Sequence, residues 1–382
     1  MRVVVPFGTR PEIVKLSPVV EALRDVGHEV HAIATGQHDD PMLSDAFFAD
    51  LMLAPDVRHE LPAGEATRFG ALLTHAYEDV ADEAPDVVVV LGDTNTVPAY
   101  ALAARRFGVP VAHLEAGLRS FNPRSLEEVN RRIGAATASL QLAPTELAGR
   151  FLRDEGVADE RIRVVGNPIT DVLRRFAPPP RSPASRQGAL VTAHRATNVD
   201  VPERLDQLVD LVRSLAAELA PVRFPVHPRT RARLEAAGAL TELERTPGLR
   251  LEQPLRYADM LDAIAAARVV VTDSGGLQEE ASWLGVPLVV LRTTTPRWEG
   301  VIAGTTRLTG LDAARARAAS LELAAPAAQE HAATTPCPYG DGHVASRVVA
   351  ALLEAQERGL LSLSEPPLAS GLPPAVADAV AT

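Results

Sequence analysis

Short runs of apolar, mostly β-branched residues alternate along this chain with longer stretches of amphipathic, helix-forming sequence. This alternation is typical of a parallel sheet whose strands are connected by helices. The clearest strand candidates are residues 2–7, 29–34, 87–91 and 109–114 in the first half, and residues 189–193, 222–226, 269–272 and 288–291 in the second. We therefore predict an α/β protein made of two Rossmann-like, doubly wound halves.

The division into two domains is predicted from chain length and from a break in the pattern. A chain of 382 residues exceeds the usual size of one hydrophobic core. Residues 177–183 are rich in proline and have no helical period, which is typical of a linker. We expect one domain over residues 1–170 and a second over 171–344, followed by a helix within 345–360. Residues 361–382 are rich in Pro, Ala and Ser and are expected to be a flexible tail.

Composition narrows the class of protein. The apolar fraction of 46% and the charged fraction of 23% are those of a globular protein. The single cysteine, Cys337, excludes an internal disulfide framework and a cysteine-based zinc cluster. The apolar run at residues 3–7 is too short for a signal peptide, and no stretch approaches the roughly 20 apolar residues that cross a bilayer. These features predict a cytoplasmic protein without a membrane segment, and the net charge of −11 argues against nucleic-acid binding.

Polar residues gather at the carboxyl ends of the predicted strands, which is where ligands bind in open parallel sheets. Ser274, Gly275 and Gly276 lie between a strand and a helix, so their backbone amides could hold a phosphate, although such a sequence also forms ordinary tight turns. Glu280, one turn into that helix, could accept hydrogen bonds from ribose hydroxyls. The cations expected near a diphosphate are Arg10, Lys15, Arg119, Arg131, His194 and Arg195.

Three carboxylates, Asp93, Glu115 and Glu127, also fall at or just after strand ends. Acids beside an anionic ligand are costly unless they transfer protons or bind hydroxyl groups. Two structural alternatives stay open: Asp93 could cap a helix, and Glu127 could form an i,i+4 pair with Arg131.

Ten motifs in fixed order carry a resemblance to a known family. They are GTRPE (8–12), GQH (36–38), GDT (92–94), HLEAGLR (113–119), EEVNR (127–131), GNP (166–168), TAHR (192–195), PVHP (225–228), TDSGGLQEE (272–280) and PYGDG (338–342). Over nearly its whole length the chain resembles the non-hydrolysing UDP-N-acetylglucosamine 2-epimerases. The resemblance implies two Rossmann-like domains facing each other across a cleft, as in GT-B glycosyltransferases, with a C-terminal helix returning to the first domain. It further implies a homodimer that uses no metal or organic cofactor.

The resemblance also implies a mechanism and roles for the residues. UDP is eliminated to leave a 2-acetamidoglycal and is then added back with protonation on the opposite face of C2, which gives UDP-N-acetylmannosamine. Asp93, Glu115 and Glu127 would be the acid/base groups, and His194 would assist at the diphosphate or the sugar hydroxyls. Arg10, Lys15, Arg131, Ser274, Gly275 and Glu280 would hold the nucleotide.

The chain departs from the family pattern at several positions. The loop at residues 292–299 reads RTTTPRWE, where the family usually has R-x-x-T-E-R-P-E, and Met260 replaces the aromatic residue beside the uracil. Gln37 and His227 match a pocket where a second UDP-N-acetylglucosamine activates bacterial members, whereas Asp40 and residues 64–65 do not match its other partners. Alternative functions are a hydrolysing 2-epimerase, a GT-B glycosyltransferase, and a sugar-nucleotide-binding regulator, which would be expected to have lost at least one of the three acids.

Overall fold

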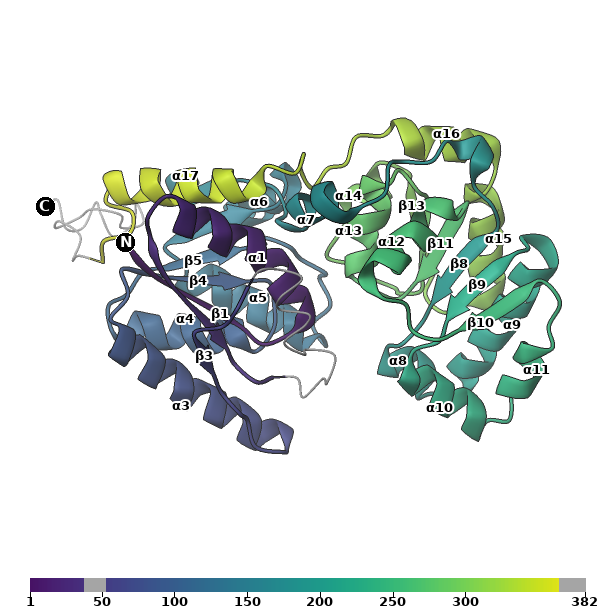
Figure 1. The fold of residues 1–382 in the computed structure, drawn as a ribbon, viewed down its shortest axis with the longest axis horizontal. Coiled ribbons are helices and arrows are strands. Elements are labelled where there is room, and N and C mark those ends of the chain that lie inside the picture. Colours follow the sequence, from purple (N-terminus) through teal and green to yellow (C-terminus); the bar gives the residue numbers. More distant parts are fainter. Residues whose placement is uncertain (38–52, 364–382) are drawn as a thin grey trace, which may run out of the picture.

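The computed structural model describes residues 1–37 and 53–363, and these form two parallel sheets surrounded by helices. His38, Asp40 and residues 364–382 of the expected tail lie outside the described residues. Figure 1 shows the two sheets side by side along the long axis of the molecule. We call the first sheet and its helices the N-terminal unit and the second sheet and its helices the C-terminal unit. The α/β fold predicted from the sequence is confirmed.

The N-terminal unit is built on a seven-stranded sheet of order β3-β2-β1-β4-β5-β6-β7, in which every pairing is parallel. Its central strands are buried on both faces, which explains their nearly continuous apolar sequence. The strands are β1 (Arg2–Phe7), β2 (Glu29–Ala34), β3 (Val57–Arg58), β4 (Val87–Leu91), β5 (Val111–Leu114), β6 (Leu140–Ala143) and β7 (Ile162–Val164). The helices are α1 (Arg10–Asp25), α3 (Glu65–Glu83), α4 (Thr96–Arg106), α5 (Leu126–Thr137), α6 (Glu146–Asp154), the 3-10 turn η1 (Asp159–Arg161) and α7 (Ile169–Phe176).

The C-terminal unit repeats this design with six parallel strands in the order β10-β9-β8-β11-β12-β13. The strands are β8 (Ala189–Thr192), β9 (Val222–Pro225), β10 (Leu249–Glu252), β11 (Val269–Thr272), β12 (Leu288–Val290) and β13 (Thr306–Leu308). The helices are η2 (Pro183–Ser185), α8 (Ala196–Val199), α9 (Pro202–Glu218), α10 (Pro228–Ala236), α11 (Leu240–Glu244), α12 (Tyr257–Ala266), α13 (Gly276–Trp283), α14 (Glu299–Ile302), α15 (Ala313–Leu323) and α16 (Pro326–Thr334).

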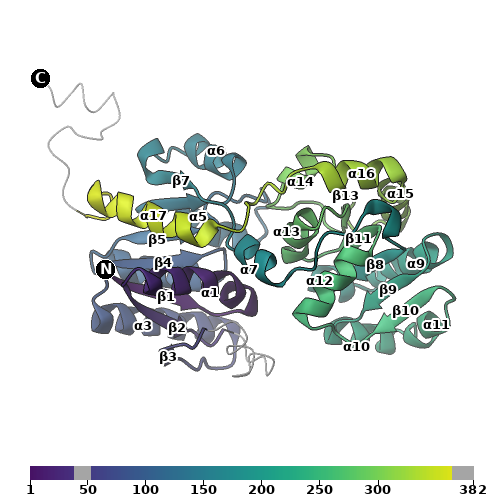
Figure 2. The same cartoon turned by 45° about the horizontal axis from the view of Figure 1, so that its top comes forward.

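The last described helix, α17 (Val344–Glu357), packs on the N-terminal unit although it follows the C-terminal unit in sequence. Figures 1 and 2 both show it lying along α1. Its residues Val344, Val348 and Leu352 are fully buried in the same apolar cluster as Val3 and Phe7 of β1. The helix therefore completes one face of the N-terminal core.

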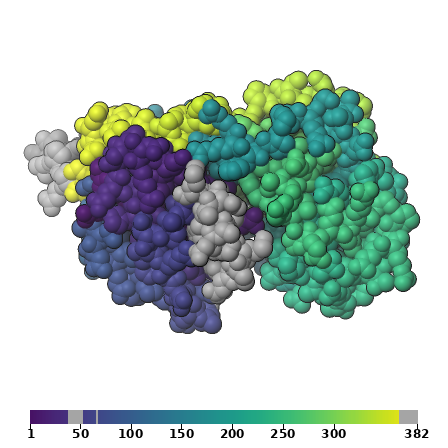
Figure 3. All heavy atoms as spheres, viewed as in Figure 1, coloured from purple at the N-terminus to yellow at the C-terminus, as the bar shows by residue number. Residues whose placement is uncertain are grey.

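The two units meet around α7 and the segment that leads into α17, where the space-filling surface is continuous between them (Figure 3). Asp171 of α7 accepts hydrogen bonds from the backbone amides of Val344 (2.8 Å) and Ala345 (3.2 Å), so it caps the start of α17. An apolar cluster joins Val14 of α1 and Val172 of α7 to residues of the C-terminal unit such as Ile264. The contact between the two units is therefore apolar at this point, while Asp171 fixes the segment that returns to the N-terminal unit.

Candidate active site

The candidate site is formed where the carboxyl ends of the two sheets approach each other. Asp93 follows β4 and Glu115 follows β5 in the N-terminal unit, while His194 follows β8 in the C-terminal unit. The turn after β4 needs a glycine, because a Cβ atom on Gly92 would lie 3.3 Å from Oε2 of Glu115 and the residue has φ +75°. Asp93 and Glu115 are therefore carried by adjacent turns in close contact.

A buried group of charged and amide side chains connects the two units, and we call it the central ion cluster. Its members are Lys15, Glu115, Asn167, Glu279 and Arg297. The Lys15 Nζ lies 2.5 Å from Glu115 Oε1 and 2.8 Å from Glu279 Oε2. Asn167 donates to the same two carboxylates at 2.6 and 2.9 Å, and Arg297 Nε donates to Glu279 at 2.7 Å.

The cluster sets the protonation of Glu115. Its burial raises the pKa, but the positive charges of Lys15 and Arg297 and the hydrogen bonds from Lys15 and Asn167 outweigh this and hold the pKa at about 2. For Lys15, burial lowers the pKa, and the two carboxylates more than compensate, so its pKa is raised. Glu115 is therefore a carboxylate and Lys15 an ammonium ion at neutral pH.

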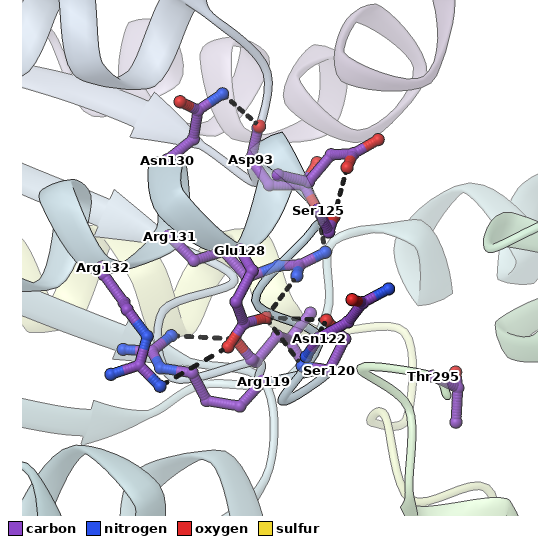
Figure 4. Close-up of polar contacts among 12 residues, drawn as sticks. Asp93, Arg119, Ser120, Asn122, Ser125, Glu128, Asn130, Arg131, Arg132 and Thr295 are labelled. Carbon is purple, nitrogen blue, oxygen red and sulfur yellow. Dashed lines mark hydrogen bonds and ion pairs between the residues drawn. The ribbon is translucent and has the colours of Figure 1, made fainter. Parts of the chain in front are cut away.

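Asp93 is held by Arg131, as Figure 4 shows. Arg131 also pairs with Glu128 at 2.9 Å, and Glu128 in turn accepts the backbone N–H of Ser120 at 2.8 Å. The Asp93 side chain remains 30% exposed, so it is oriented and still accessible. It does not cap a helix, because Asn95 occupies the N-cap position of α4.

Glu127 lies at the start of α5 and does not pair with Arg131, contrary to the i,i+4 alternative, since Arg131 binds Asp93 and Glu128. Its carboxylate accepts a hydrogen bond from the Ser125 hydroxyl. Burial raises its pKa, while the hydrogen bond from Ser125 and the charges of Arg195 and Arg131 outweigh burial and leave the pKa below its usual value. Arg195, a residue of the C-terminal unit, is thus one of the charges that act on Glu127.

His194 is oriented by Asp273, a fully buried residue that directly follows β11. The His194 Nδ1 lies 3.0 Å from Asp273 Oδ1, and Asp273 also accepts the backbone amides of His194 and Arg195 and the side-chain amide of Asn198. Burial raises the pKa of Asp273, but His194 and the backbone amides of Arg195 and His194 lower it below its usual value. A fixed Nδ1 leaves Nε2 as the ring nitrogen available for chemistry.

Ser274, Gly275 and Gly276 form the turn into α13, as expected. A Cβ atom on Gly275 would lie 3.2 Å from Arg297 Nη1, whereas one on Gly276 would meet no described atom within 4 Å. The turn thus contacts the central ion cluster on one side and leaves space beside Gly276 on the other. Backbone amides at a helix start with open space beside them suit an anionic group.

Glu280 lies beside this turn and is 6% exposed. Burial and the Glu279 carboxylate raise its pKa to about 7, with Lys15, Tyr257 and Arg10 acting in the opposite direction. Arg10 is one of the positive charges that act on Glu280. Met260 packs with Tyr257 in the apolar cluster of α12.

Arg119 requires a correction. Its guanidinium is fully buried and binds Glu155 through two hydrogen bonds of 2.8 and 2.6 Å. This bidentate ion pair neutralises the Arg119 charge inside the N-terminal unit. Arg119 is therefore not among the cations that lie between the two sheets.

The two residues expected in an activator pocket lie on different units. Gln37 donates to the Thr96 hydroxyl at 2.8 Å in the N-terminal unit. The His227 ring lies 5.5 Å from the His194 ring in the C-terminal unit. His227 is therefore a neighbour of the candidate catalytic histidine.

Sequence reasoning did not single out four residues of the site, Asn167, Asp273, Glu279 and Arg297. Asp273 had a usable signal, because it directly follows a buried strand. Glu12 also had one, since Thr9-x-x-Glu12 is a capping box, and its carboxylate accepts hydrogen bonds from Gly8, Thr9 and Thr94. Asn167, Glu279 and Arg297 could be identified only from the structure, through their contacts in the central ion cluster.

Residues 1–37 and 53–363 bear on the questions of a bound metal and of a membrane span. Within these ranges no group of three or more His, Cys, Asp or Glu side chains is arranged to hold a metal ion. Among the helices described there, none combines the length and apolar character that a bilayer span requires.

Two parallel α/β units whose strand ends face each other define the GT-B-like class of protein. Residues 21–353 match the family model of UDP-N-acetylglucosamine 2-epimerase. The chain belongs to this family, which confirms the resemblance found in the sequence.

Individual relatives agree with this assignment. The chain is 38% identical over 325 residues to the UDP-N-acetylglucosamine 2-epimerase of Methanocaldococcus jannaschii, covering 81% of this chain and 88% of the relative. It is 34% identical over 357 residues to the UDP-2,3-diacetamido-2,3-dideoxy-D-glucuronate 2-epimerase of Pseudomonas aeruginosa, covering 91% and 98%. A crystal structure of the M. jannaschii enzyme in complex with UDP-GlcNAc and UDP superposes with a TM-score of 0.81 at 34% identity, covering 93% of this chain and all of that one.

Proposed function

We propose that this protein interconverts UDP-N-acetylglucosamine and UDP-N-acetylmannosamine by the non-hydrolysing route. The observation that carries the proposal is the arrangement of ionised or accessible carboxylates at the ends of adjacent strands. Asp93 and Glu115 come from neighbouring turns, and Glu127 lies within the electrostatic reach of Arg195 of the other unit. The relatives named above act on UDP-linked 2-acetamido sugars, which supports the same substrate class here.

The chemistry requires groups on both faces of C2. The C2–H is not acidic in the sugar itself, but loss of UDP from C1 places positive charge beside it. One carboxylate removes the C2 proton as the C1–O bond breaks, which gives the 2-acetamidoglycal and UDP. UDP then adds back to C1 while C2 receives a proton from the opposite face. Asp93, Glu115 and Glu127 are the proposed acid/base groups.

The same proposal assigns the nucleotide to the C-terminal unit. Gly275, Gly276 and Ser274 would hold the diphosphate through their amides, with Arg10, Arg195 and His194 as cationic or donor partners. Glu280 would accept the ribose hydroxyls, and Met260 would pack on the uracil. Arg131 orients Asp93, and Lys15 orients Glu115, so both act on the acids in the described arrangement. The main role proposed for Arg10, Arg195 and His194 is to stabilise the negative charge of the leaving diphosphate.

The remaining assignments are part of the proposal. We infer functional domains over residues 1–170 and 171–344, a helix within 345–360 that belongs to the first, and a homodimer that works in the cytoplasm. A second UDP-N-acetylglucosamine acting as activator through Gln37 and His227 also belongs here. No metal or organic cofactor enters the proposed chemistry.

A second candidate substrate is a UDP-linked 2-acetamido uronate. Burial and the nearby charges of Arg195, Arg297 and Arg131 lower the pKa of Arg292 to about 10, so cations are crowded at this side of the site. An additional sugar carboxylate would relieve that crowding. Assaying UDP-N-acetylglucosamine and the corresponding UDP-hexuronate in parallel distinguishes the two substrates.

The deciding experiment is to incubate the protein with UDP-N-acetylglucosamine in D2O and follow C2 by NMR. We expect deuterium at C2 and a signal from UDP-N-acetylmannosamine. Free N-acetylmannosamine and UDP would instead indicate the hydrolysing alternative, and transfer to an added acceptor without C2 exchange would indicate a glycosyltransferase.

Asp93→Asn provides the matched variant. It should abolish exchange and leave UDP affinity within about threefold, because the lost group serves the transition state. The control is Asp86→Asn, since Asp86 lies just before β4, at the opposite end of that strand, where it accepts the Arg2 amide at 2.7 Å. Equal loss of exchange and UDP affinity in Asp93→Asn would point to a structural role and contradict the proposal.

A further inference from the structure

The loop between β12 and α14 crosses from the C-terminal unit to the N-terminal unit through Trp298. The indole Nε1–H donates to the backbone carbonyl of Arg119 at 2.8 Å. The indole ring centroid lies 6.3 Å from that of Phe121, which packs edge-on against Phe151 at 5.1 Å. Next to it, Glu299 accepts a hydrogen bond from the Thr145 hydroxyl at 2.5 Å.

The acceptor on the N-terminal unit belongs to Arg119, a residue that is buried and paired. Arg119 follows the turn after β5 that carries Glu115, and its own guanidinium is fully buried in the bidentate pair with Glu155. Phe121 has the left-handed conformation (φ +54°), which costs a non-glycine residue free energy, and its half-exposed ring contacts Phe151 and Trp298. Trp298 therefore contacts the segment directly beyond the turn that holds Glu115.

Arg297, the residue before Trp298, contacts the C-terminal unit instead. Arg297 pairs with Glu279 at 2.7 Å and reaches the turn at Gly275. The loop is braced internally, because the Thr295 hydroxyl accepts the Arg297 amide at 3.1 Å and donates to Gln278 at 2.7 Å. The consecutive side chains of Arg297 and Trp298 thus connect the central ion cluster with the Arg119 carbonyl of the N-terminal unit.

We propose that Trp298 is a positioning residue for the reaction. By anchoring the loop to the Arg119 carbonyl, it holds Arg297 in the central ion cluster and keeps the Ser274–Gly276 turn at a fixed separation from Glu115. The inference rests on the proposed function for its kinetic consequence, but the anchoring itself can be measured without any activity.

Two variants separate the hydrogen bond from the ring. Trp298→Phe keeps an aromatic ring against Phe121 and removes the donor, and we expect kcat to fall roughly 3- to 10-fold, the value of one lost hydrogen bond. Trp298→Ala removes both contacts and should lower kcat by roughly 10- to 100-fold. Because the anchor acts on geometry at the reacting carbon, KM and UDP affinity should change less than about threefold in Trp298→Phe. The control is Trp283→Phe, which changes the second of the chain's two tryptophans.

Hydrogen–deuterium exchange mass spectrometry tests the anchor independently of catalysis. Trp298→Phe should accelerate amide exchange in residues 292–299 and in residues 119–122, while Trp283→Phe should not. Unchanged exchange in both segments would overturn the anchoring. Faster exchange with unchanged kcat, or equal losses of kcat, UDP affinity and thermal stability, would overturn the positioning role. If the wild-type protein shows no epimerisation, the exchange result still decides the anchor, so failure of the proposed function is recognised separately.

Discussion

Replacing Lys15 by methionine tests the central ion cluster most directly, because the side chain keeps its length and loses its charge. Lys15 is 5% exposed and lies between the carboxylates of Glu115 and Glu279. Removing one partner of a buried ion pair costs about 3–5 kcal/mol, since the remaining charge stays buried. The pKa of Glu115 reports on all partners of that carboxylate together: against burial, Lys15, Arg297 and Asn167 lower it from 4.5 to about 2, which corresponds to about 3 kcal/mol.

The pH dependence follows from the direction of that shift. A carboxylate whose folded pKa is depressed stabilises the folded state above its unfolded pKa of 4.5, and this contribution is lost as the pH falls toward 2. The difference in unfolding free energy between wild type and Lys15→Met should therefore be largest near pH 7 and should shrink as the pH falls through 4.5. Urea unfolding at pH 7 and pH 4 measures both quantities.

A matched control lies on the same helix. Arg24 pairs with Asp56 at 3.0 Å, but both side chains are more than one-third exposed, so Arg24→Met should cost less than about 1 kcal/mol. Lys15→Met combined with Glu115→Gln should recover part of the loss, because the double variant no longer buries that unpaired charge. The reasoning is refuted if Lys15→Met costs no more than Arg24→Met, or if its cost is the same at both pH values.

Three further variants test other parts of the structure. Asp171→Ala removes the cap of α17 and should lower the free energy of unfolding by about 1–2 kcal/mol, measured by thermal unfolding. Asp171→Asn should retain most of the stability. An unchanged melting temperature in Asp171→Ala would show that the cap is unimportant. Gly117→Ala should lower the unfolding free energy by about 2–4 kcal/mol, because φ is +82° and the new Cβ would lie 2.2 Å from the carbonyl oxygen of Ala148. The control Gly27→Ala, with φ +85° and no neighbour within 4 Å, should cost only about 1 kcal/mol. Equal costs would contradict the steric overlap at Gly117. Glu280→Gln should gain stability relative to wild type as the pH rises from 4.5 to 7, by up to about 3 kcal/mol, because over this range the wild-type carboxyl ionises in the unfolded state and stays protonated in the folded state. A constant difference across this range would count against the raised pKa.

The central strands could be predicted from sequence, and the outer strands could not. Strands β1, β4 and β11 have the bounds expected from their apolar runs, because burial on both faces leaves a clear signal. The edge strands β3 and β13 have only two and three residues, too few for a pattern. The strand expected at 109–114 begins two residues later, at Val111, since Pro110 has no N–H for the ladder.

The site shows the same limit at the level of side chains. The positions of Asp93, Glu115 and Ser274 followed from the rule that ligands bind at strand ends. The ion-pair partner of each cation could not be predicted, because the sequence offers several carboxylates that each cation could bind. Arg119 binds Glu155, and Arg131 binds Asp93 and Glu128. Such choices depend on long-range packing, which a single sequence does not display.

The return of α17 to the N-terminal core has a consequence for biosynthesis. A chain emerging from the ribosome cannot close the apolar face around β1 until the residues of α17 have left the exit tunnel, long after the strands of that sheet have been made. The early-synthesised half must therefore wait with an uncovered apolar surface while the later half folds. Premature termination before Val344 would leave this surface open and would be expected to direct the product to chaperones or proteases.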